Sequence, residues 1–300
     1  MSKPRKVLDI SIPVPWGVIA GKTFGEERSI PVLCVHGRND NLETFSQLLP
    51  LLPDNLYYVC IDLPGHGKSS HAEKGYILDL IWFTMTVKRI VDSCNWSRLY
   101  YLGHSLGGQI GFLLAALFPE LVVKLVIIDS LIDAHTPPEL LTRTLRNNLF
   151  ESFLKLEKRS SLDEAPTYSF VEFVQKMIEA RMTEVSHSHI KTMAERNLIK
   201  IGPDQFKFGN DQRNKVIKIH FTSEQLENLV KAIHCPTLEV LGRNSAVTMP
   251  LERMKKSSLR KNTNITVQVI DGDHDIHITR AEQVAKLISL FLSREVMSKL

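Results

Sequence analysis

Short, nearly continuous apolar runs recur along this chain, and each ends in Gly, Asp or another turn residue. They occupy residues 31–37, 57–67, 99–105, 122–130, 236–245 and 264–274. Val, Ile, Leu and Tyr runs of this length are typical of parallel strands that are buried on both faces. Helical patterns fall between several of them, near residues 42–52, 78–93, 106–118 and 280–293. Strands that alternate with helices predict an α/β fold with a mostly parallel, doubly wound sheet.

Two segments depart from this alternation. The residues before 31 have the pattern of a hairpin at an antiparallel edge of the sheet. The stretch 131–234 is richer in charge and mostly helical, with helices expected near 137–159, 169–184 and 186–199 and then a short turn or hairpin. We therefore expect a core formed by residues 1–130 and 235–300, and a helical cap, residues 131–234, inserted before the last two strands.

Composition and charge exclude several classes of protein. The hydrophobic fraction is 43% and the charged fraction 23%, as in ordinary soluble globular proteins. The net charge is +4 without a long basic run, so no nucleic-acid partner is expected. No apolar stretch approaches the roughly 20 residues of a membrane span. The cysteines lack the spacing of a zinc site, so we expect neither a metal nor another cofactor.

The segment "YYLGHSLGGQIG" contains a G-x-S-x-G pattern formed by Gly103, Ser105 and Gly107. This pattern indicates a nucleophilic serine only when a strand precedes it and a helix follows, and the flanking runs predict both. A tight turn there would strain the serine backbone and present its hydroxyl at the sheet edge. The alternative is a serine that merely caps the following helix. We predict that Ser105 is the nucleophile.

Two backbone amides are candidates for an oxyanion hole. The N–H of Leu106 would lie at the N-terminus of the helix after Ser105, where anionic oxygen is stabilised. The N–H of Arg38 follows the run that ends in "CVHGRND". Two such donors could hold the tetrahedral intermediate of acyl transfer. The Arg38 side chain could attract an anionic substrate group or simply be solvated in a loop.

The general base is expected in "VIDGDHDIHI", directly after the last predicted strand. This loop places His274 at the same sheet edge as Ser105, so His274 is the predicted base. His277 is a reserve candidate, with packing or hydrogen bonding as its other role.

The segments "HGRND", "DLPGHGKSS", "GHSLGG" and "GDHDIH" resemble the α/β-hydrolase superfamily. More narrowly, "VPWGVIAGKTFG", "PVLCVHGRNDNLETFSQLLPLLP" and "YYVCIDLPGHGKSSH" resemble the serine hydrolase-like protein family. The resemblance covers about residues 1–130 and 235–295, and extends more weakly into the cap through "NDQRNK". It implies the α/β-hydrolase fold and a serine nucleophile at Ser105. It does not supply a natural substrate.

The acid of the triad is less well marked. Many members of the superfamily place an Asp a few residues after the glycine that ends the penultimate strand, but here "RNS" follows Gly242. Asn and Ser can accept a hydrogen bond from an imidazole, but neither supplies a negative charge. Asp129, at the end of an earlier strand, is the tentative acid. Its other role would be to bind amides at that strand end. Asp133 and Asp273 are weaker candidates.

These residues together predict a serine hydrolase that cleaves carboxylic ester or thioester bonds of a small, acyl or lipid-like molecule through an acyl-enzyme. Apolar cap residues would either shape an acyl pocket or form the core of the cap; they are Phe150, Phe153, Leu154, Phe170 and Phe173. The alternative is a hydrolase-fold binding or interaction protein whose triad has degenerated.

The sequence ends in Ser298, Lys299 and Leu300, a tripeptide that matches a peroxisomal address. We expect a peroxisomal import receptor as a partner and a peroxisomal location, with the cytoplasm as the alternative if the match is a coincidence.

Overall fold

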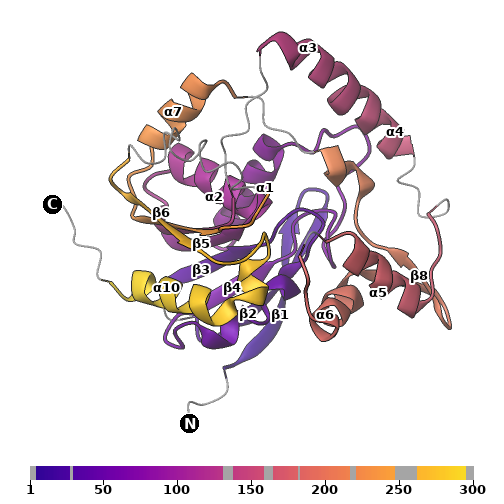
Figure 1. Cartoon of the computed structure of the whole chain (residues 1–300), viewed down its shortest axis with the longest axis horizontal. Helices are drawn as coiled ribbons and strands as arrows, with labels where there is room; N and C mark the ends of the chain where they lie inside the picture. Colours follow the sequence, from indigo (N-terminus) through magenta and orange to yellow (C-terminus); the bar gives the residue numbers. More distant parts are fainter. Residues whose placement is uncertain are drawn as a thin grey trace.

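The computed structural model describes residues 5–27, 30–130, 138–158, 165–181, 183–216, 221–246 and 262–294. An eight-stranded sheet runs through this part of the chain, in the order β1-β2-β4-β3-β5-β6-β9-β10 (Figure 1). Its strands are β1 (Val7–Val14), β2 (Gly17–Phe24), β3 (Pro31–Val35), β4 (Tyr57–Ile61), β5 (Leu99–His104), β6 (Val122–Ile128), β9 (Thr237–Gly242) and β10 (Ile265–Ile270). The Ser298-Lys299-Leu300 tripeptide lies outside the described residues, so the peroxisomal address stays a prediction.

The sheet has one antiparallel edge. β1 and β2 form a hairpin that joins the sheet through the antiparallel pair β2–β4. From β4 to β10, every neighbouring pair of strands is parallel. The predicted α/β fold with a mostly parallel, doubly wound sheet is therefore confirmed.

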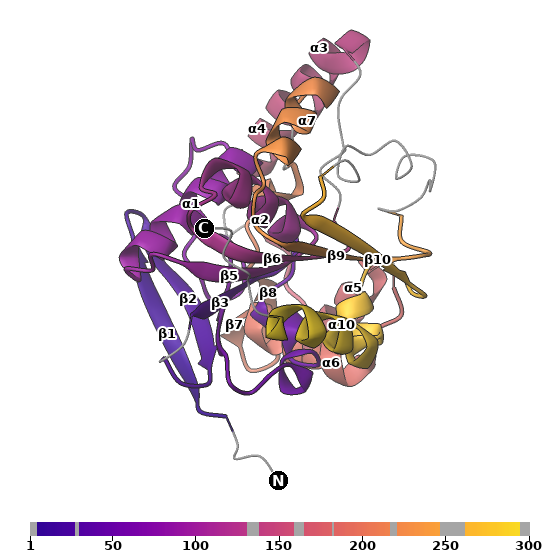
Figure 2. The same cartoon turned by 90° about the vertical axis from the view of Figure 1, so that its left-hand side faces the viewer.

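Helices cover both faces of the sheet (Figure 2). Leu33 and Val35 of β3 pack in one apolar cluster with α1 (Leu80–Ser93) and α2 (Leu106–Leu117). The alternate residues, such as Val32, pack in a second cluster with α10 (Ala281–Ser293). This period of two explains why the strands read as unbroken apolar runs, since both faces are buried.

The predicted helix over 42–52 is wrong in type. The segment forms two short 3-10 helices, η1 (Leu42–Phe45) and η2 (Leu49–Leu51). Pro50 lies in the second of them and has no backbone N–H for a continuous α-helical ladder. The segment remains compact because Leu42 and other apolar side chains pack into the α10 cluster.

The segment between β6 and β9 holds the expected helices and hairpin. Its elements are η3 (Pro138–Leu140), α3 (Leu141–Thr144), the π-helical η4 (Leu145–Glu151), α4 (Ser152–Lys158), α5 (Phe170–Glu179), α6 (His187–Asn197), β7 (Leu198–Gly202), β8 (Gln205–Phe208), η6 (Gln212–Val216) and α7 (Ser223–Lys231). The helices α5 and α6 and the strand β8 share a separate apolar cluster that includes Phe173, Ile190 and Phe206. By contrast, Leu226 and Val230 of α7 pack in the same cluster as α1 and α2. The cap boundary at residue 234 therefore stays a prediction.

No helix in the described ranges has both the length and the apolar character to cross a bilayer.

Candidate active site

A one-residue junction joins the strand β5 to the helix α2. β5 ends at His104 and α2 begins at Leu106, so Ser105 alone makes the turn. Its φ of 50° and ψ of −117° lie in a region that residues with a side chain rarely adopt. The strand before and the helix after are the two elements that the G-x-S-x-G pattern requires.

The glycines beside Ser105 are required by the packing of the turn. A Cβ on Gly103 would lie 2.3 Å from the carbonyl oxygen of Gly107. A Cβ on Gly107 would lie 2.0 Å from the carbonyl oxygen of Val35 in the neighbouring strand β3. Any larger residue at either position would push the turn away from the sheet.

Ser105, His274 and Asp129 form one hydrogen-bonded series. The Nε2 atom of His274 lies 3.0 Å from Ser105 Oγ, and its Nδ1 atom lies 2.5 Å from Asp129 Oδ2. Asp129 directly follows β6, has a φ of 43° and is fully buried. The structure thus brings together the three residues that the sequence named, from three distant parts of the chain.

Asp129 also accepts hydrogen bonds from the loop after β9, the loop in which the expected carboxylate is missing. Its Oδ1 atom accepts a hydrogen bond of 2.8 Å from the Gly242 amide, and its Oδ2 atom accepts one of 2.5 Å from Ser245 Oγ. Asp129 therefore makes the contacts that each of its two considered roles requires, since it binds a strand-end amide and the imidazole. A degenerate triad was suggested by the missing acid after Gly242, but a carboxylate reaches His274 from the end of β6.

The surroundings of His274 favour its protonated form. Burial by itself would lower the pKa of this imidazole, but the hydrogen bond and charge of Asp129, followed by the charges of Asp275 and Asp40, raise the pKa above its ordinary value. An opposite charge nearby stabilises imidazolium. The site is therefore suited to a base that takes up a proton during the reaction.

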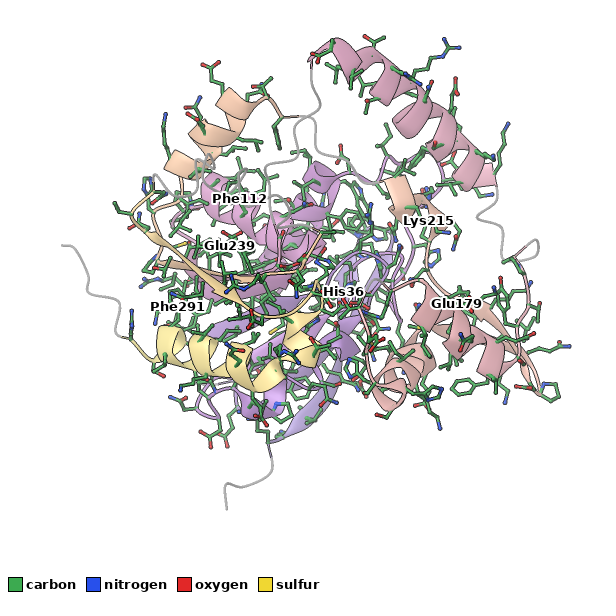
Figure 3. All side chains as sticks on the ribbon, in the orientation of Figure 1. His36, Phe112, Glu179, Lys215, Glu239 and Phe291 are labelled. Carbon is green, nitrogen blue, oxygen red and sulfur yellow. The ribbon has the colours of Figure 1, made fainter. Side chains whose placement is uncertain are left out.

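Glu239 is a buried carboxyl group that sequence reasoning missed. It lies in β9, in the sheet between α2 and α10 (Figure 3). Burial, and then the charge of Asp129, raises its pKa to about 8. Its apolar neighbours in the strand gave no signal of a site, and Glu239 is predominantly uncharged at neutral pH.

The two segments that carry the expected oxyanion donors both adjoin Ser105. Leu106 is the first residue of α2, so its N–H is among those without an intrahelical acceptor. A Cβ on Gly37 would lie only 3.1 Å from Ser105 Cβ, so the loop that carries Arg38 passes directly against the serine. The Arg38 side chain itself is exposed.

A cavity of about 1250 Å³ opens above Ser105 and His274. Its cap side includes Leu156, Met177 and Phe208. The apolar cap residues singled out from the sequence do not line this cavity. Phe150 and Leu154 are exposed. The other three pack in apolar clusters; they are Phe153, Phe170 and Phe173.

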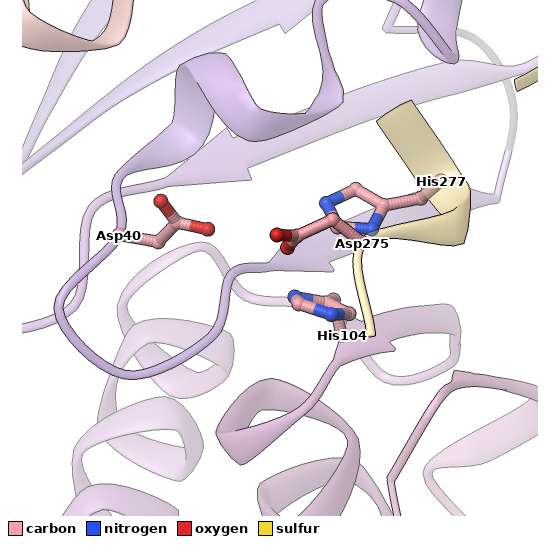
Figure 4. A group of neighbouring side chains, drawn as sticks. All are labelled: Asp40, His104, Asp275 and His277. Atoms are coloured by element: carbon pink, nitrogen blue, oxygen red, sulfur yellow. The ribbon is translucent and has the colours of Figure 1, made fainter. Parts of the chain in front are cut away.

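A second buried group adjoins the triad, and its members were not identified from the sequence as one site. Asp40, His104, Asp275 and His277 offer ligand atoms that all lie within 4.8 Å of one another (Figure 4). The His104 ring lies 3.9 Å from the His277 ring and 4.7 Å from the His274 ring, measured between centroids. Burial, followed by the charges of neighbouring groups, lowers the pKa of both His104 and His277 well below the ordinary value. Two neutral imidazoles and two carboxylates form a donor set that zinc and similar ions accept.

A protein cation already compensates the two carboxylates of this group. Arg181 donates from Nη1 to Asp275 Oδ2 at 3.0 Å, and from Nη2 to Asp40. A divalent ion bound by these carboxylates would have to compete with the guanidinium. The arrangement is therefore closed by Arg181, and we derive no metal site from it.

A family model described as the α/β hydrolase fold matches residues 30–158. Along the sequence, the chain is 30% identical to serine hydrolase-like protein 2 of Homo sapiens, over 96% of this chain and 95% of that protein. It is 32% identical to a probable serine hydrolase of Drosophila melanogaster, over 95% of this chain and 87% of that protein.

Solved structures resemble the whole chain. A hypothetical protein from Pseudomonas aeruginosa PAO1 superposes with a TM-score of 0.83 at 26% identity, over 95% of this chain and 99% of that one. A thioesterase domain from the curacin biosynthetic pathway superposes with a TM-score of 0.77 at 21% identity, over 94% of this chain and 99% of that domain. At that identity the second likeness shows the fold alone.

Proposed function

Because the chain belongs to the α/β-hydrolase family and, within it, to the serine hydrolase-like proteins, we propose that it cleaves carboxylic ester or thioester bonds through an acyl-enzyme at Ser105. Membership of the family supports a hydrolase in general. The observation that carries the finer proposal is the series of hydrogen bonds from Ser105 through His274 to Asp129. It lies against a cavity large enough for a small acyl compound.

In the first half of the reaction, the neutral Nε2 of His274 takes the proton of Ser105 Oγ as that oxygen attacks the substrate carbonyl. The amides of Arg38 and Leu106 hold the negative oxygen of the tetrahedral intermediate. The bond to the alcohol or thiol then breaks, and the leaving group receives the proton from His274. The acyl group remains on Ser105.

In the second half, His274 takes a proton from water, and the resulting nucleophile attacks the acyl carbonyl. The bond to Ser105 Oγ breaks, the acid leaves, and His274 returns the proton to the serine. Asp129 accepts the hydrogen bond from Nδ1 throughout, which fixes the tautomer and stabilises the imidazolium.

The lining of the cavity supports an acyl substrate. Leu156, Met177 and Phe208 provide apolar surface on the cap side of the cavity, as is usual where an apolar ligand binds.

The proposal is tested by labelling with a fluorophosphonate probe, followed by hydrolysis of short-chain aryl esters. The wild type and a control variant with an exposed serine replaced, Ser188→Ala, should both be labelled and active. Ser105→Ala should be neither. Folded wild type that resists the probe and cleaves no ester would favour the binding-protein alternative. Hydrolysis that survives in Ser105→Ala would refute the assignment of the nucleophile.

A further inference from the structure

We propose that Arg181 is a positioning residue of the hydrolase, which joins the loop after β3 to the loop that carries His274 and holds both in the geometry that acyl transfer needs. The inference rests on the proposed function, because it assigns a role around the same Ser105 and His274. It goes beyond that function because it assigns a role to a residue of the cap. The hydrogen bonds that the structure shows for Arg181 reach Asp40, Asp275 and Met193, and neither Ser105 nor the imidazole.

The position of Arg181 allows it to reach both loops. It lies after α5, two residues beyond Glu179, and its side chain is only 13% exposed. Its Nη2 atom also lies 3.4 Å from Met193 Sδ on α6. The guanidinium therefore lies buried between α6 of the cap and the two loops beside the triad.

The two carboxylates that Arg181 binds belong to the two loops that the reaction uses. Asp275 immediately follows His274, and its carbonyl oxygen accepts the amide hydrogen bonds that begin α9 (Ile276–Thr279). Asp40 lies two residues after Arg38, whose amide is a proposed oxyanion donor. A planar guanidinium has donors in fixed directions, so binding two carboxylates at once sets the spacing between their loops.

The charges around His274 give this link a second consequence. The titratable groups that face the imidazole come from the ends of β6 and β5, from the loop after β3, from its own loop and from α9; they are Asp129, His104, Asp40, Asp275 and His277. Arg181, from the cap, binds two of them, Asp40 and Asp275. The two histidines are held neutral. Asp40 and Asp275 raise the pKa of His274, and the positive charge of Arg181 lies between these carboxylates. Removing that charge should raise the pKa of His274 further, so the base would be protonated over a wider pH range.

The experiment compares wild type with Arg181→Met and Arg181→Lys, by kcat and by kcat/KM for an aryl ester from pH 5 to 9. For Arg181→Met we expect a kcat lower by about 10- to 100-fold, the range that misplacement of reacting groups produces. Its acid limb should move to higher pH by about one unit, because the variant loses a nearby positive charge that disfavours the imidazolium. Arg181→Lys keeps the charge, so its acid limb should stay near that of wild type. Its kcat should fall, since one ammonium group cannot span both carboxylates.

Arg196 of α6 provides a matched control. It also joins the cap to the core through a buried carboxylate, since its Nε lies 2.8 Å from Asp62 Oδ2. Arg196→Met should therefore lower the melting temperature without moving the acid limb, because Asp62 is not among the groups that shift the pKa of His274. An acid limb that moves equally in Arg196→Met and Arg181→Met would overturn the proposal.

NMR titration of the His274 ring separates this proposal from the proposed function. The shift in Arg181→Met should appear even if wild type cleaves no ester; in that case the substrate proposal fails and the role of Arg181 stands. An unchanged titration together with a kcat within twofold of wild type would refute the role of Arg181. If Arg181→Met does not fold, Arg181→Lys decides, because a wild-type kcat in that variant would show that the double contact is not needed.

Discussion

Ser245 and His274 share a single oxygen of Asp129. The Ser245 hydroxyl and the His274 ring nitrogen Nδ1 both lie 2.5 Å from Asp129 Oδ2. Ser245 belongs to the loop after β9, where the superfamily pattern leads one to expect the acid, yet its side chain only donates to the carboxylate. The loop after β9 therefore contributes only a hydroxyl that binds the acid, and the carboxylate itself comes from the end of β6.

The first prediction concerns the unequal weight of these two residues. Asp129→Asn should lower kcat by about four orders of magnitude, the cost of losing the carboxylate in a serine–histidine–aspartate template. Ser245→Ala should cost tenfold or less, since it removes one hydrogen bond worth roughly 1 kcal/mol. Steady-state kinetics of an aryl ester measures both. Equal, small losses would remove Asp129 from the mechanism.

The second prediction is that the acid can be moved. Since Ser245 Oγ and His274 Nδ1 meet at the same oxygen, a carboxylate introduced by Ser245→Asp should reach the imidazole. Added to Asp129→Asn, it should recover about tenfold or more of the lost kcat, which is ~1.4 kcal/mol of transition-state stabilisation. Ser245→Asn in the same background is the control, because it adds similar bulk without charge. Equal rates in the two double variants would show that the position is wrong.

The third prediction concerns pH. Because the pKa of His274 is raised above 6.5, kcat/KM should fall with decreasing pH from an apparent pKa above that value. The effect on stability has the opposite sign. The contribution from protonating His274 is complete below pH 6.5 and is lost as the pH rises through the folded-state pKa.

Asp129→Asn removes the main causes that raise the pKa of His274, so its residual acid limb should move to lower pH. Rate profiles of wild type and Asp129→Asn from pH 5 to 9 measure the difference. An acid limb that stays in place in the variant would contradict this electrostatic account.

The fourth prediction concerns Glu239. Its folded-state pKa of about 8 exceeds the ordinary 4.5, so the fold binds its proton more tightly than the unfolded chain does. The resulting stability is complete below pH 4.5 and is lost as the pH rises through 8, a difference of ~5 kcal/mol for a shift of this size. Glu239→Gln should therefore melt at a higher temperature than wild type at pH 8.5, with a smaller or reversed difference at pH 5.

Thermal unfolding at the two pH values measures this effect. Glu195→Gln on the exposed side of α6 serves as the control, because that residue is not buried. If wild type and Glu239→Gln lose stability in parallel between pH 5 and pH 8.5, Glu239 is not the group responsible.

Much of the fold followed from local pattern. β3, β4 and β6 are buried at every residue, so their Val and Ile runs stood out from the polar turns. The serine turn could be predicted because its glycines are required by close backbone contacts within a few residues and with one neighbouring strand. The error over 42–52 arose because apolar spacing alone does not distinguish an α-helix from two 3-10 turns around Pro50.

The rest of the site depends on contacts between distant segments. Asp129 could not be chosen over other acids from the sequence alone, because what brings it to His274 is the order of β6, β9 and β10 in the sheet. Arg181 gave no signal at all, since an arginine after a surface helix is ordinarily solvated. Its two carboxylates lie 141 and 94 residues away along the chain.

The small apolar cluster of α5, α6 and β8 has a consequence for local unfolding of the protein. Its apolar side chains pack among themselves and not into either cluster of the sheet. Buried ion pairs such as Arg196–Asp62 join it to the core, so this part of the chain should open as one cooperative unit once those pairs break. Amide deuteration should then proceed along Phe170–Glu179 and His187–Asn197 at similar rates, well before it reaches Leu99–His104. Opening of α5, α6 and β8 would then admit substrate to the cavity while the amides of the central strands remain protected from exchange.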